Sequence, residues 1–368
     1  MTRRSRLPSD HFDGQRFVNP TLPGRRAPTI LAVLKMLREK RSQWPVRVEN
    51  KGIPALHEPL QHDDVAITFV NHATFLIQFN GINVLTDPIW SERASPVRWA
   101  GPKRVREPGV AWDALPRIDV VLLSHNHYDH LDIATLARLK DRYEPIMLVA
   151  AGDGRIIEPL GVRQLHELDW WNSFTLSEQS KFTFVPAQHF SARSLFDRQE
   201  SLWGGYVIEV AGRRIFFSGD TGYSVHFAEI SRRLGRPDIA LLGIGSYMPQ
   251  WFMRSVHMNP ADAVAAHRDL GALFSIGMHF GTFQLSAEGI DQPLLDLARA
   301  LREQGISESD FVTLEVGETR IYRASELTRD APSPDHARTL SSDAFSPHRP
   351  NGAVQESRDR QTPPPQPL

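Results

Sequence analysis

The chain has 368 residues and a formal net charge of −1, so its overall charge gives no general attraction to nucleic acid or to an anionic surface. It contains no cysteine, which excludes disulfide bonds and restricts the protein ligands of any metal site to His, Asp and Glu. No stretch approaches the roughly 18 apolar residues that a membrane-spanning helix needs.

The N-terminal segment 1–28 is rich in Arg, Pro and polar residues and is predicted to be an extension with little regular structure. Its start is basic but lacks the apolar stretch of a signal peptide, so the expected location is the cytoplasm. Arg3, Arg4 and Arg6 leave open a peripheral contact with the inner face of a membrane, although so short a basic cluster is usually only solvated.

Apolar periodicity predicts the elements that follow. Residues 29–40 have the apolar spacing of an amphipathic helix, and Asn80-Gly81 is typical of a hairpin turn between two strands. Later short apolar runs predict buried strands, and the helices between them mostly end at a glycine. The predicted strands are 65–70, 74–79, 82–85, 120–123, 146–150, 181–185, 205–210, 214–218, 239–244, 274–278, 311–316 and 320–322, and the predicted helices are 29–40, 133–140, 225–234, 260–270 and 293–304.

The order of these elements indicates an α/β fold. Strands dominate the first part of the chain, and strands mix with helices in the second part, which suits two sheets packed face to face with helices outside, an αββα sandwich. One domain is predicted over 29–323. After about Ala324, Pro, Ser, Arg and Asp dominate, so 324–368 is predicted to be a disordered tail.

The segment 120–132, VVLLSHNHYDHLD, is the densest group of metal-ligand side chains in the chain. Residues two apart in an extended segment point to the same side, so His125 and His127 aim at one point. A turn directly afterwards would let Asp129 and His130 aim at a second point close by. Imidazole and carboxylate suit zinc and similar borderline metals. The sequence therefore predicts a metal site at the end of this strand.

Three later strands each deliver a ligand-type side chain at the C-terminal end. Each of these is weak evidence alone, because a lone histidine at a strand end is usually a hydrogen-bonded structural residue. Glycines beside two of them would let the backbone approach a crowded centre. Together with the first group they provide enough candidate ligands for two metals: His125, His127, Asp129, His130, His189, Asp220 and His279.

Longer motifs make a resemblance specific. They are LTDPIWSERASP at 85–96, GPKR at 101–104, SHNHYDHLD at 124–132, ELDWW at 167–171, GDTGY at 219–223, QWFM at 250–253 and HFGTF at 279–283. The ordered histidines and acids resemble the metallo-β-lactamase-fold hydrolases, and the motifs are similar to one family among them, the N-acyl-phosphatidylethanolamine-hydrolysing phospholipases D. The similarity runs from about His11 to Thr319. It implies a four-layer αββα sandwich of the metallo-β-lactamase fold.

The resemblance also implies roles for individual residues. Two Zn²⁺ ions are the implied cofactors, with other divalent metals left open. Asp87 would support the site from behind the ligands, His257 would sit close to the substrate, and Arg193 matches a basic position of the family. Ala192 and Val256 depart from the mammalian pattern, which puts substrate and effector preferences in question. One zinc would be held by His125, His127 and His189, the other by Asp129, His130 and His279, and Asp220 would bridge both.

The implied reaction is hydrolysis of N-acyl-phosphatidylethanolamine to an N-acylethanolamine and phosphatidic acid by a hydroxide that bridges the two metals. His257 is the candidate proton donor, with a helix-entry histidine bonded to backbone as the alternative. Arg193 would clamp phosphate, with a solvated surface arginine as the alternative. The loop 246–253 is unusually apolar, so Trp251 and Phe252 are predicted to contact the lipid, although such loops are often simply packed.

Three other functions stay open at this point. The chain could be a hydrolase of the same fold that acts on a soluble ester, lactone or phosphodiester. It could be a redox protein with two irons, although it has no flavin-binding domain, or a non-catalytic binding protein, although no ligand is missing. The expected partner is a phospholipid or other phosphodiester substrate and not a nucleic acid, and a homodimer is left open.

Overall fold

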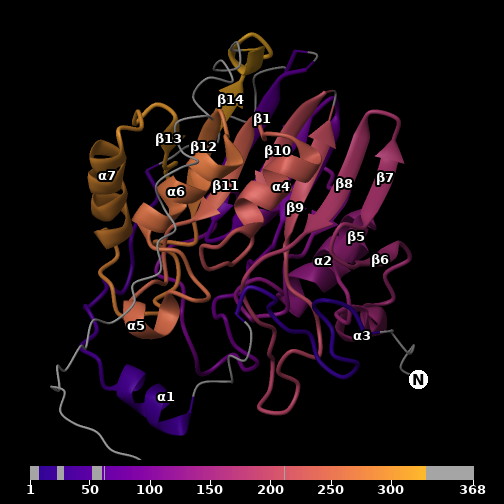
Figure 1. Ribbon diagram of the computed structural model, residues 1–368. Helices are drawn as coiled ribbons and strands as arrows, with labels where there is room; N and C mark the ends of the chain where they lie inside the picture. Colours follow the sequence, from indigo (N-terminus) through magenta and orange to yellow (C-terminus); the bar gives the residue numbers. More distant parts are fainter. Residues whose placement is uncertain (1–7, 23–28, 52–59, 62, 211, 329–368) are drawn as a thin grey trace, which may run out of the picture. The chain divides into compact units, whose positions relative to one another are not determined.

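Two seven-stranded β-sheets form the centre of the computed structural model, which describes residues 8–22, 29–51, 60–61, 63–210 and 212–328 (Figure 1). The first sheet has the strand order β14-β1-β2-β3-β4-β5-β6, and the second has the order β13-β12-β11-β10-β9-β8-β7. The strands are β1 Val65–Asn71, β2 Thr74–Phe79, β3 Ile82–Thr86, β4 Val120–Leu122, β5 Ile146–Ala150, β6 Leu165–Leu168, β7 Ser173–Ser177, β8 Ser180–Val185, β9 Gly205–Val210, β10 Arg213–Phe217, β11 Ile239–Gly243, β12 Phe274–Met278, β13 Phe311–Val312 and β14 Thr319–Tyr322.

Each sheet is antiparallel in one part and parallel in the other. β14, β1, β2 and β3 are antiparallel neighbours, whereas β3 to β6 run parallel. In the second sheet β7 to β10 are antiparallel and β10 to β13 are parallel. Parallel neighbours need crossover connections, and most of the helices lie in these connections. The helices are α1 Ile30–Leu37, α2 Ile133–Tyr143, α3 Gly154–Ile157, α4 His226–Leu234, α5 Gln250–Met253, α6 Pro260–Leu270 and α7 Gln292–Gln304.

Three hydrophobic clusters hold these layers together. The largest lies between the two sheets and includes the fully buried Phe69 and Phe184. A second cluster joins the outer face of the second sheet to α4, α6 and α7, and includes Val264. A third joins the first sheet to α2 through residues such as Leu136. Figure 1 shows α4 and α6 lying across the second sheet. The layers are helix, sheet, sheet and helix, so the predicted αββα sandwich is confirmed. Among the described residues, no helix has the length and apolarity to cross a bilayer.

Five predicted ranges coincide with observed elements, namely 74–79, 146–150, 205–210, 260–270 and 274–278. Two predictions ended three or more residues too late: α1 ends at Leu37, and the strand predicted over 311–316 ends at Val312. Four elements, β6, β7, α3 and α5, were not predicted. β7 is an edge strand whose side chains alternate between exposed and half-buried, so it has no continuous apolar run. The α3 and α5 helices have only four residues each, too few to show a helical period.

Residues 8–22, part of the predicted N-terminal extension, pack against the body. Phe17 is 1% exposed and joins the largest cluster. The Asn19 side chain donates a hydrogen bond of 2.7 Å to the carbonyl of His189, one of the predicted ligands. This segment therefore contacts the region of the predicted metal site.

The first residues of the predicted tail, 324–327, pack against the body. The Ala324 N–H donates to Asp64 Oδ1 at 3.1 Å, and Arg213 donates to the carbonyl of Leu327 at 3.1 Å. Leu327 is 3% exposed and joins the largest cluster. The boundary predicted at 324 is therefore corrected, because the packed body extends through Leu327. The low apolar content of this segment does not indicate that a single leucine packs into the core. Residues 329–368 lie outside the described part of the chain.

A pair of truncations should locate the end of the body. A chain that ends after Thr328 should keep its melting temperature and activity. A chain that ends after Glu326 loses the buried Leu327, worth about 2 kcal/mol, and should melt roughly 3 °C lower. Thermal unfolding followed by circular dichroism measures both. Equal melting of the two truncations would mean that Leu327 contributes nothing, and a drop in the longer one would mean that 329–368 support the fold.

Candidate metal centre

Strand ends from both sheets bring the predicted ligands together. β4 of the first sheet leads directly into the segment 125–130. In the second sheet, β8 leads to His189, β10 to Asp220 and β12 to His279. The C-terminal ends of parallel strands meet at one edge of a sheet, so this topology collects side chains that are far apart in the sequence. The structure places all seven predicted ligands in two adjoining groups that share Asp220.

The first group consists of His125, His127, His189 and Asp220, whose ligand atoms all lie within 4.8 Å of one another. His127 Nδ1 is 2.8 Å from His125 Nε2 and 3.2 Å from His189 Nε2. Asp220 Oδ2 is 3.9 Å from His125 Nε2 and 3.8 Å from His189 Nε2. Three imidazoles and one carboxylate oxygen therefore converge on one point.

The second group consists of Asp129, His130, His279 and the same Asp220. Asp129 Oδ2 is 3.3 Å from His130 Nε2 and 3.4 Å from His279 Nε2. Asp220 Oδ2 is 3.2 Å from His130 Nε2, and Asp220 Oδ1 is 3.2 Å from His279 Nε2. The Asp220 carboxylate therefore lies between the two groups and faces both.

The spacing and the free nitrogen atoms of these side chains fit a divalent cation. A four-coordinate zinc with ligands at about 2.0–2.2 Å separates its donors by roughly 3.3–3.6 Å, close to most of the distances above. Within the part of the chain that the structure describes, the Nε2 atoms of His130 and His279 are buried without a hydrogen-bond partner. His189 Nδ1 lies 2.8 Å from the carbonyl of Val256 and donates to it, which directs the lone pair of Nε2 to the first group. The residues present therefore fit two divalent cations with nitrogen and oxygen ligands.

Asp87 anchors the ligand loop from behind. It is fully buried, and its Oδ2 accepts from Ser124 Oγ at 2.6 Å and from His130 Nδ1 at 2.7 Å. Its Oδ1 accepts from the Ser124 N–H at 2.8 Å. The proton of His130 is thereby held on Nδ1, which leaves the Nε2 lone pair for a metal. Asp87 has a φ of 33°, an unusual value for a residue with a side chain, and such backbone strain tends to collect at functional sites. Asp87 is thus placed to position His130, and its carboxylate also lies within 4.8 Å of ligand atoms of His125 and His130.

Gly219 brings the bridging aspartate close to this loop. Its φ is 56°, and a Cβ added there would lie 2.6 Å from the carbonyl oxygen of Gly204 and 2.7 Å from Ser124 Cβ. Only glycine satisfies both conditions. The first glycine of the GDTG motif is therefore explained by the close approach of the two sheets next to Asp220.

The histidine pKa values differ between the two groups. Burial lowers the pKa of His127 to about 4, and burial also holds the pKa values of His125 and His189 well below their ordinary range, so all three imidazoles are neutral and ready to bind a metal. In the second group burial also lowers the pKa of His279, but the nearby carboxylates of Asp220 and Asp129 outweigh it and raise that pKa to about 9. A metal entering the second group therefore has to displace a proton.

His257 lies between the ligand groups and an apolar cavity. Its Nδ1 is 3.8 Å from Asp220 Oδ2, and its side chain is 13% exposed. Burial lowers its pKa to about 4, although the charge of Asp220 opposes this. The cavity has a volume of about 190 Å³, and its lining is mainly apolar, including Met36, Phe190, Phe252, Val256 and Leu285 as well as His257. The structure therefore brings His257 to the metal groups, as the sequence predicted, and adds a cavity beside it.

The two aromatic residues predicted to contact the lipid have different environments. Phe252 lines the apolar cavity. Trp251 is 48% exposed, its Nε1 donates to Glu39 Oε1 at 3.1 Å, and Lys35 Nζ lies 4.7 Å from the centre of its ring. Figure 1 shows α1, which carries Lys35, below α5, which carries Trp251. Only Phe252 is thus brought next to the metal groups.

Arg193 has a different environment from the one the sequence suggested. Its Nη1 donates to the carbonyls of Asn126 at 2.8 Å and Leu131 at 2.9 Å, and its guanidinium carbon is 3.9 Å from the centre of the Tyr128 ring. These hydrogen bonds join the two ends of the segment that carries the ligands His127, Asp129 and His130. The geometry indicates a positioning role for Arg193, and contact with phosphate stays a prediction.

His72 is a residue of the site that sequence reasoning missed. It lies in the turn between β1 and β2, is 1% exposed, and its Nε2 is 2.9 Å from Asp129 Oδ2. Burial lowers its pKa to about 3, so the ring is neutral. Its position in the sequence is the available signal, because His72, like the predicted ligands, directly follows an apolar strand.

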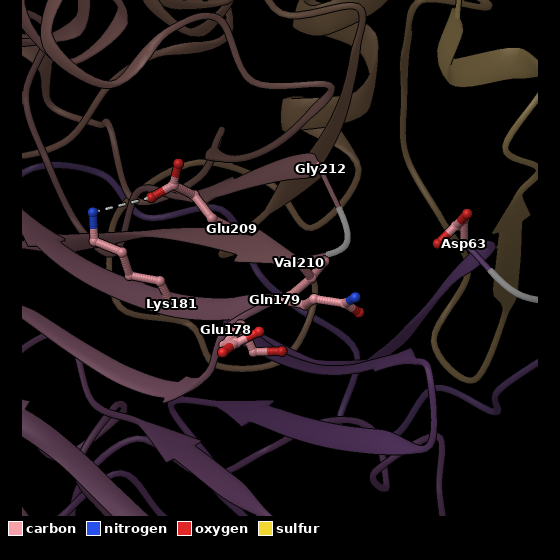
Figure 2. Close-up of a pocket in the computed structure, with 8 residues that line it drawn as sticks. Asp63, Glu178, Gln179, Lys181, Glu209, Val210 and Gly212 are labelled. Atoms are coloured by element: carbon pink, nitrogen blue, oxygen red, sulfur yellow. Dashed lines mark ion pairs between the residues drawn. The ribbon is translucent and has the colours of Figure 1, made fainter.

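Two larger pockets have no predicted metal ligand in their lining, although Tyr128 and Arg193, beside the ligand loop, line the larger one. One, of about 730 Å³, is lined by the loop around Arg93 and by the start of α2. The other, of about 570 Å³, is shown in Figure 2 with Asp63, Lys181 and Glu209, where Lys181 Nζ is 3.5 Å from Glu209 Oε2. It lies where β8 begins, the opposite end of that strand from His189. Among the described residues, neither pocket holds a group of potential metal ligands.

Comparisons with known proteins agree with this geometry. Residues 82–280 match the model of the β-lactamase superfamily domain. The chain is 36% identical over 274 residues to N-acyl-phosphatidylethanolamine-hydrolysing phospholipase D 1 of Caenorhabditis elegans, covering 70% of this chain and 76% of that protein. It is 31% identical over 263 residues to a metal-dependent hydrolase of Methanopyrus kandleri, covering 69% of this chain and 98% of that one. A crystal structure of an isothiocyanate hydrolase from Delia radicum gut bacteria is similar in fold, with a TM-score of 0.58 and 21% identity over 70% of this chain and 100% of that one.

The family match covers part of each sheet, from β3 to β12, and every predicted ligand from His125 to His279. The fold and the two His/Asp groups are those expected of a metal-dependent hydrolase. The chain therefore belongs to the N-acyl-phosphatidylethanolamine-hydrolysing phospholipase D family, within the metal-dependent hydrolases of the β-lactamase superfamily.

Proposed function

We propose that this chain is a binuclear zinc phosphodiesterase of phospholipase D type, which hydrolyses N-acyl-phosphatidylethanolamine to an N-acylethanolamine and phosphatidic acid. The observation that carries the proposal is the position of Asp220 between two ligand groups, 3.2 Å from both His130 and His279 and beside an apolar cavity. The activity named for the C. elegans relative, 36% identical to this chain, supports the choice of substrate.

The chain's own residues would prepare the site for this reaction. Bound zinc ions would supply a nucleophile from water at neutral pH and take up negative charge on the phosphoryl oxygens. Asp87 holds the ring of His130 at 2.7 Å, and the carbonyl of Val256 holds the ring of His189 at 2.8 Å, so both imidazoles keep their orientation. Such preorganisation avoids rearrangement of the ligands as charge develops.

His257 is our candidate for the group that protonates the leaving oxygen of the ethanolamine. Its ring borders both the ligand groups and the cavity, so it can reach a substrate that occupies both. Burial lowers its pKa to about 4, which disfavours the protonated form in the empty pocket. An anionic phosphodiester beside the ring would favour that form and raise the pKa toward neutrality.

The apolar cavity supports a lipid over a soluble ester. Its lining of methionine, phenylalanine, valine and leucine side chains suits an acyl chain and offers few polar partners to a small polar substrate. The helix α1, which contributes Met36 to this cavity, exposes Ile30 by 78% and Leu31 by 77%. We propose that these side chains make a peripheral contact with the bilayer from which the substrate is drawn.

The origin of the new oxygen atom tests the reaction. Hydrolysis in water enriched in ¹⁸O should place the label in phosphatidic acid, because the nucleophile attacks phosphorus and the ethanolamine oxygen leaves. Mass spectrometry of both products reads the label directly. Label in the N-acylethanolamine would mean attack at carbon and would refute this mechanism. Rapid opening of a lactone without turnover of any N-acyl phospholipid would instead favour a hydrolase of soluble substrates.

A further inference from the structure

His72 occupies a position that neither the ligand set nor the turn explains. It follows Asn71, the last residue of β1, and it is the first residue of the two-residue connection to β2. Its φ is 47°, a left-handed conformation that glycine adopts without strain. The side chain is nevertheless a large imidazole with an exposed fraction of 1%. An observed backbone outlier with a buried polar side chain calls for a reason beyond the turn.

His72 contacts two members of the second ligand group at once. Its Nε2 is 2.9 Å from Asp129 Oδ2. Its carbonyl oxygen accepts the backbone N–H of His279 at 2.7 Å, and the two rings lie with centroids 4.0 Å apart. Its own N–H donates to Thr282 Oγ1 at 3.1 Å, beyond His279 in the sequence. One residue of the first sheet therefore holds a ligand from each sheet.

The three imidazoles near Asp129 Oδ2 differ in their hydrogen bonding. A carboxylate oxygen only accepts hydrogen bonds, so the short contact from His72 requires a proton on its Nε2. The Nε2 atoms of His130 and His279 are farther away, at 3.3 and 3.4 Å, and neither has a hydrogen-bond partner in the described part of the chain. His72 is thus a donor to Asp129, while the Nε2 atoms of the other two rings face the ligand group without a hydrogen-bond partner among the described residues.

We infer that His72 is a positioning residue of the second metal group: its Nε2–H orients the Asp129 carboxylate, and its backbone carbonyl sets the place of His279. This inference rests on the proposed binuclear centre. Hydrogen-bond partners of metal ligands typically change metal affinity by about 10–100-fold. The loss of metal affinity should affect the group of Asp129, His130 and His279. In the described part of the chain, His72 has no contact with a histidine of the first group.

Two substitutions and a control test the inference. His72→Phe keeps a ring but removes the donor, whereas His72→Gln keeps an N–H at about the reach of Nε2. His267→Phe is the matched control, because His267 on α6 is also a buried histidine. Its Nδ1 lies 2.8 Å from Ser275 Oγ, and it belongs to none of the ligand groups. Each protein is loaded with Zn²⁺, dialysed against a graded series of chelator concentrations, and analysed for zinc per chain. Cobalt-loaded samples add a visible absorption spectrum that reports ligand geometry.

The wild type and His267→Phe should retain two metals over the same chelator range. His72→Phe should lose one metal at a chelator strength about 10–100-fold lower and show an altered cobalt spectrum, and His72→Gln should restore both toward the wild type. Unchanged retention and spectrum in His72→Phe would overturn the inference. Equal loss in the Phe and Gln variants would overturn it in favour of His72 as a ligand itself.

A comparison of amides keeps the test decisive if His72→Phe does not fold. His72→Asn has the same chemistry as His72→Gln but is too short to reach Asp129, so only the Gln variant should hold two metals. Equal retention by these two would also overturn the inference. A wild type that never binds more than one metal would instead contradict the proposed binuclear centre, so the two failures are distinguishable.

Discussion

Replacing Asp220 by Asn should lower hydrolysis by roughly 10³-fold or more while the chain stays folded. Its carboxylate faces both ligand groups, with oxygens 3.2 Å from the Nε2 atoms of His130 and His279. An amide of the same size offers one neutral oxygen and a nitrogen that cannot bind a cation, so two positive ions would lose their shared negative charge. Turnover measured at saturating substrate, together with zinc per chain, reads the effect.

Asp238→Asn is the matched control for this substitution. Asp238 Oδ2 accepts the backbone N–H of Arg214 at 2.7 Å near the start of β10, the opposite end of that strand from Asp220. Its neutral variant should keep turnover within about twofold, since surface and peripheral changes rarely act at a distance. Near-normal turnover by Asp220→Asn with two bound metals would remove Asp220 from the catalytic centre.

The strand-end ligands could be predicted from the sequence because their signal is local. His125 and His127 follow an apolar run at a spacing of two, and His189, Asp220 and His279 each follow a run of the same kind. Short apolar runs also predict buried strands, and buried strands predict two packed sheets. The fold class and the meeting of these side chains therefore follow from patterns within a few residues.

Contacts between the sheets could not be predicted in this way. His72 is bonded to Asp129 of its own sheet, and its ring lies tilted against that of His279 of the other, so its role depends on how the two sheets pack. Arg104 of the GPKR motif is similar: it is 5% exposed and donates to the carbonyls of Ile89 and Ser91. Nothing in the residue types distinguishes such a structural arginine from one that binds phosphate.

The direction of a side chain on a loop is equally hidden. Arg193 has the right type and place in the sequence for a phosphate clamp, yet its guanidinium donates to the carbonyls of Asn126 and Leu131. Asp197 directs this turn, because its Oδ1 accepts the backbone N–H groups of Arg193 and Ser194. A turn held by such local hydrogen bonds directs the arginine toward these carbonyls, a contact that its residue type alone does not indicate.

Removing the metals should destabilise the protein strongly. Each site that is filled at about 100 times its dissociation constant adds about 2.7 kcal/mol to the free energy of unfolding, so two sites add about 5 kcal/mol. Dialysis against a chelator should then lower the melting temperature by roughly 10 °C or more, and zinc should restore it. A chelated protein that melts at the same temperature as the loaded one would contradict a metal centre at the ligands described.

Rebinding of the metals should release protons. Burial lowers the pKa of His279, but the nearby carboxylates of Asp220 and Asp129 outweigh this and raise it to about 9, so the metal-free ring is protonated at pH 7. The pKa of His130 is also raised well above its ordinary value: burial opposes this, but the charges of Asp220, Asp129 and Asp87 outweigh it. A cation needs the neutral rings, so metal affinity should increase as pH rises from 6 toward 9.

Calorimetric titration of the chelated protein at pH 7, in two buffers of different ionisation enthalpy, counts the protons directly. We expect about one to two protons released for the second metal and fewer for the first, whose three histidines are already neutral. Metal binding that released no protons in either step would mean that these histidines do not supply the ligands.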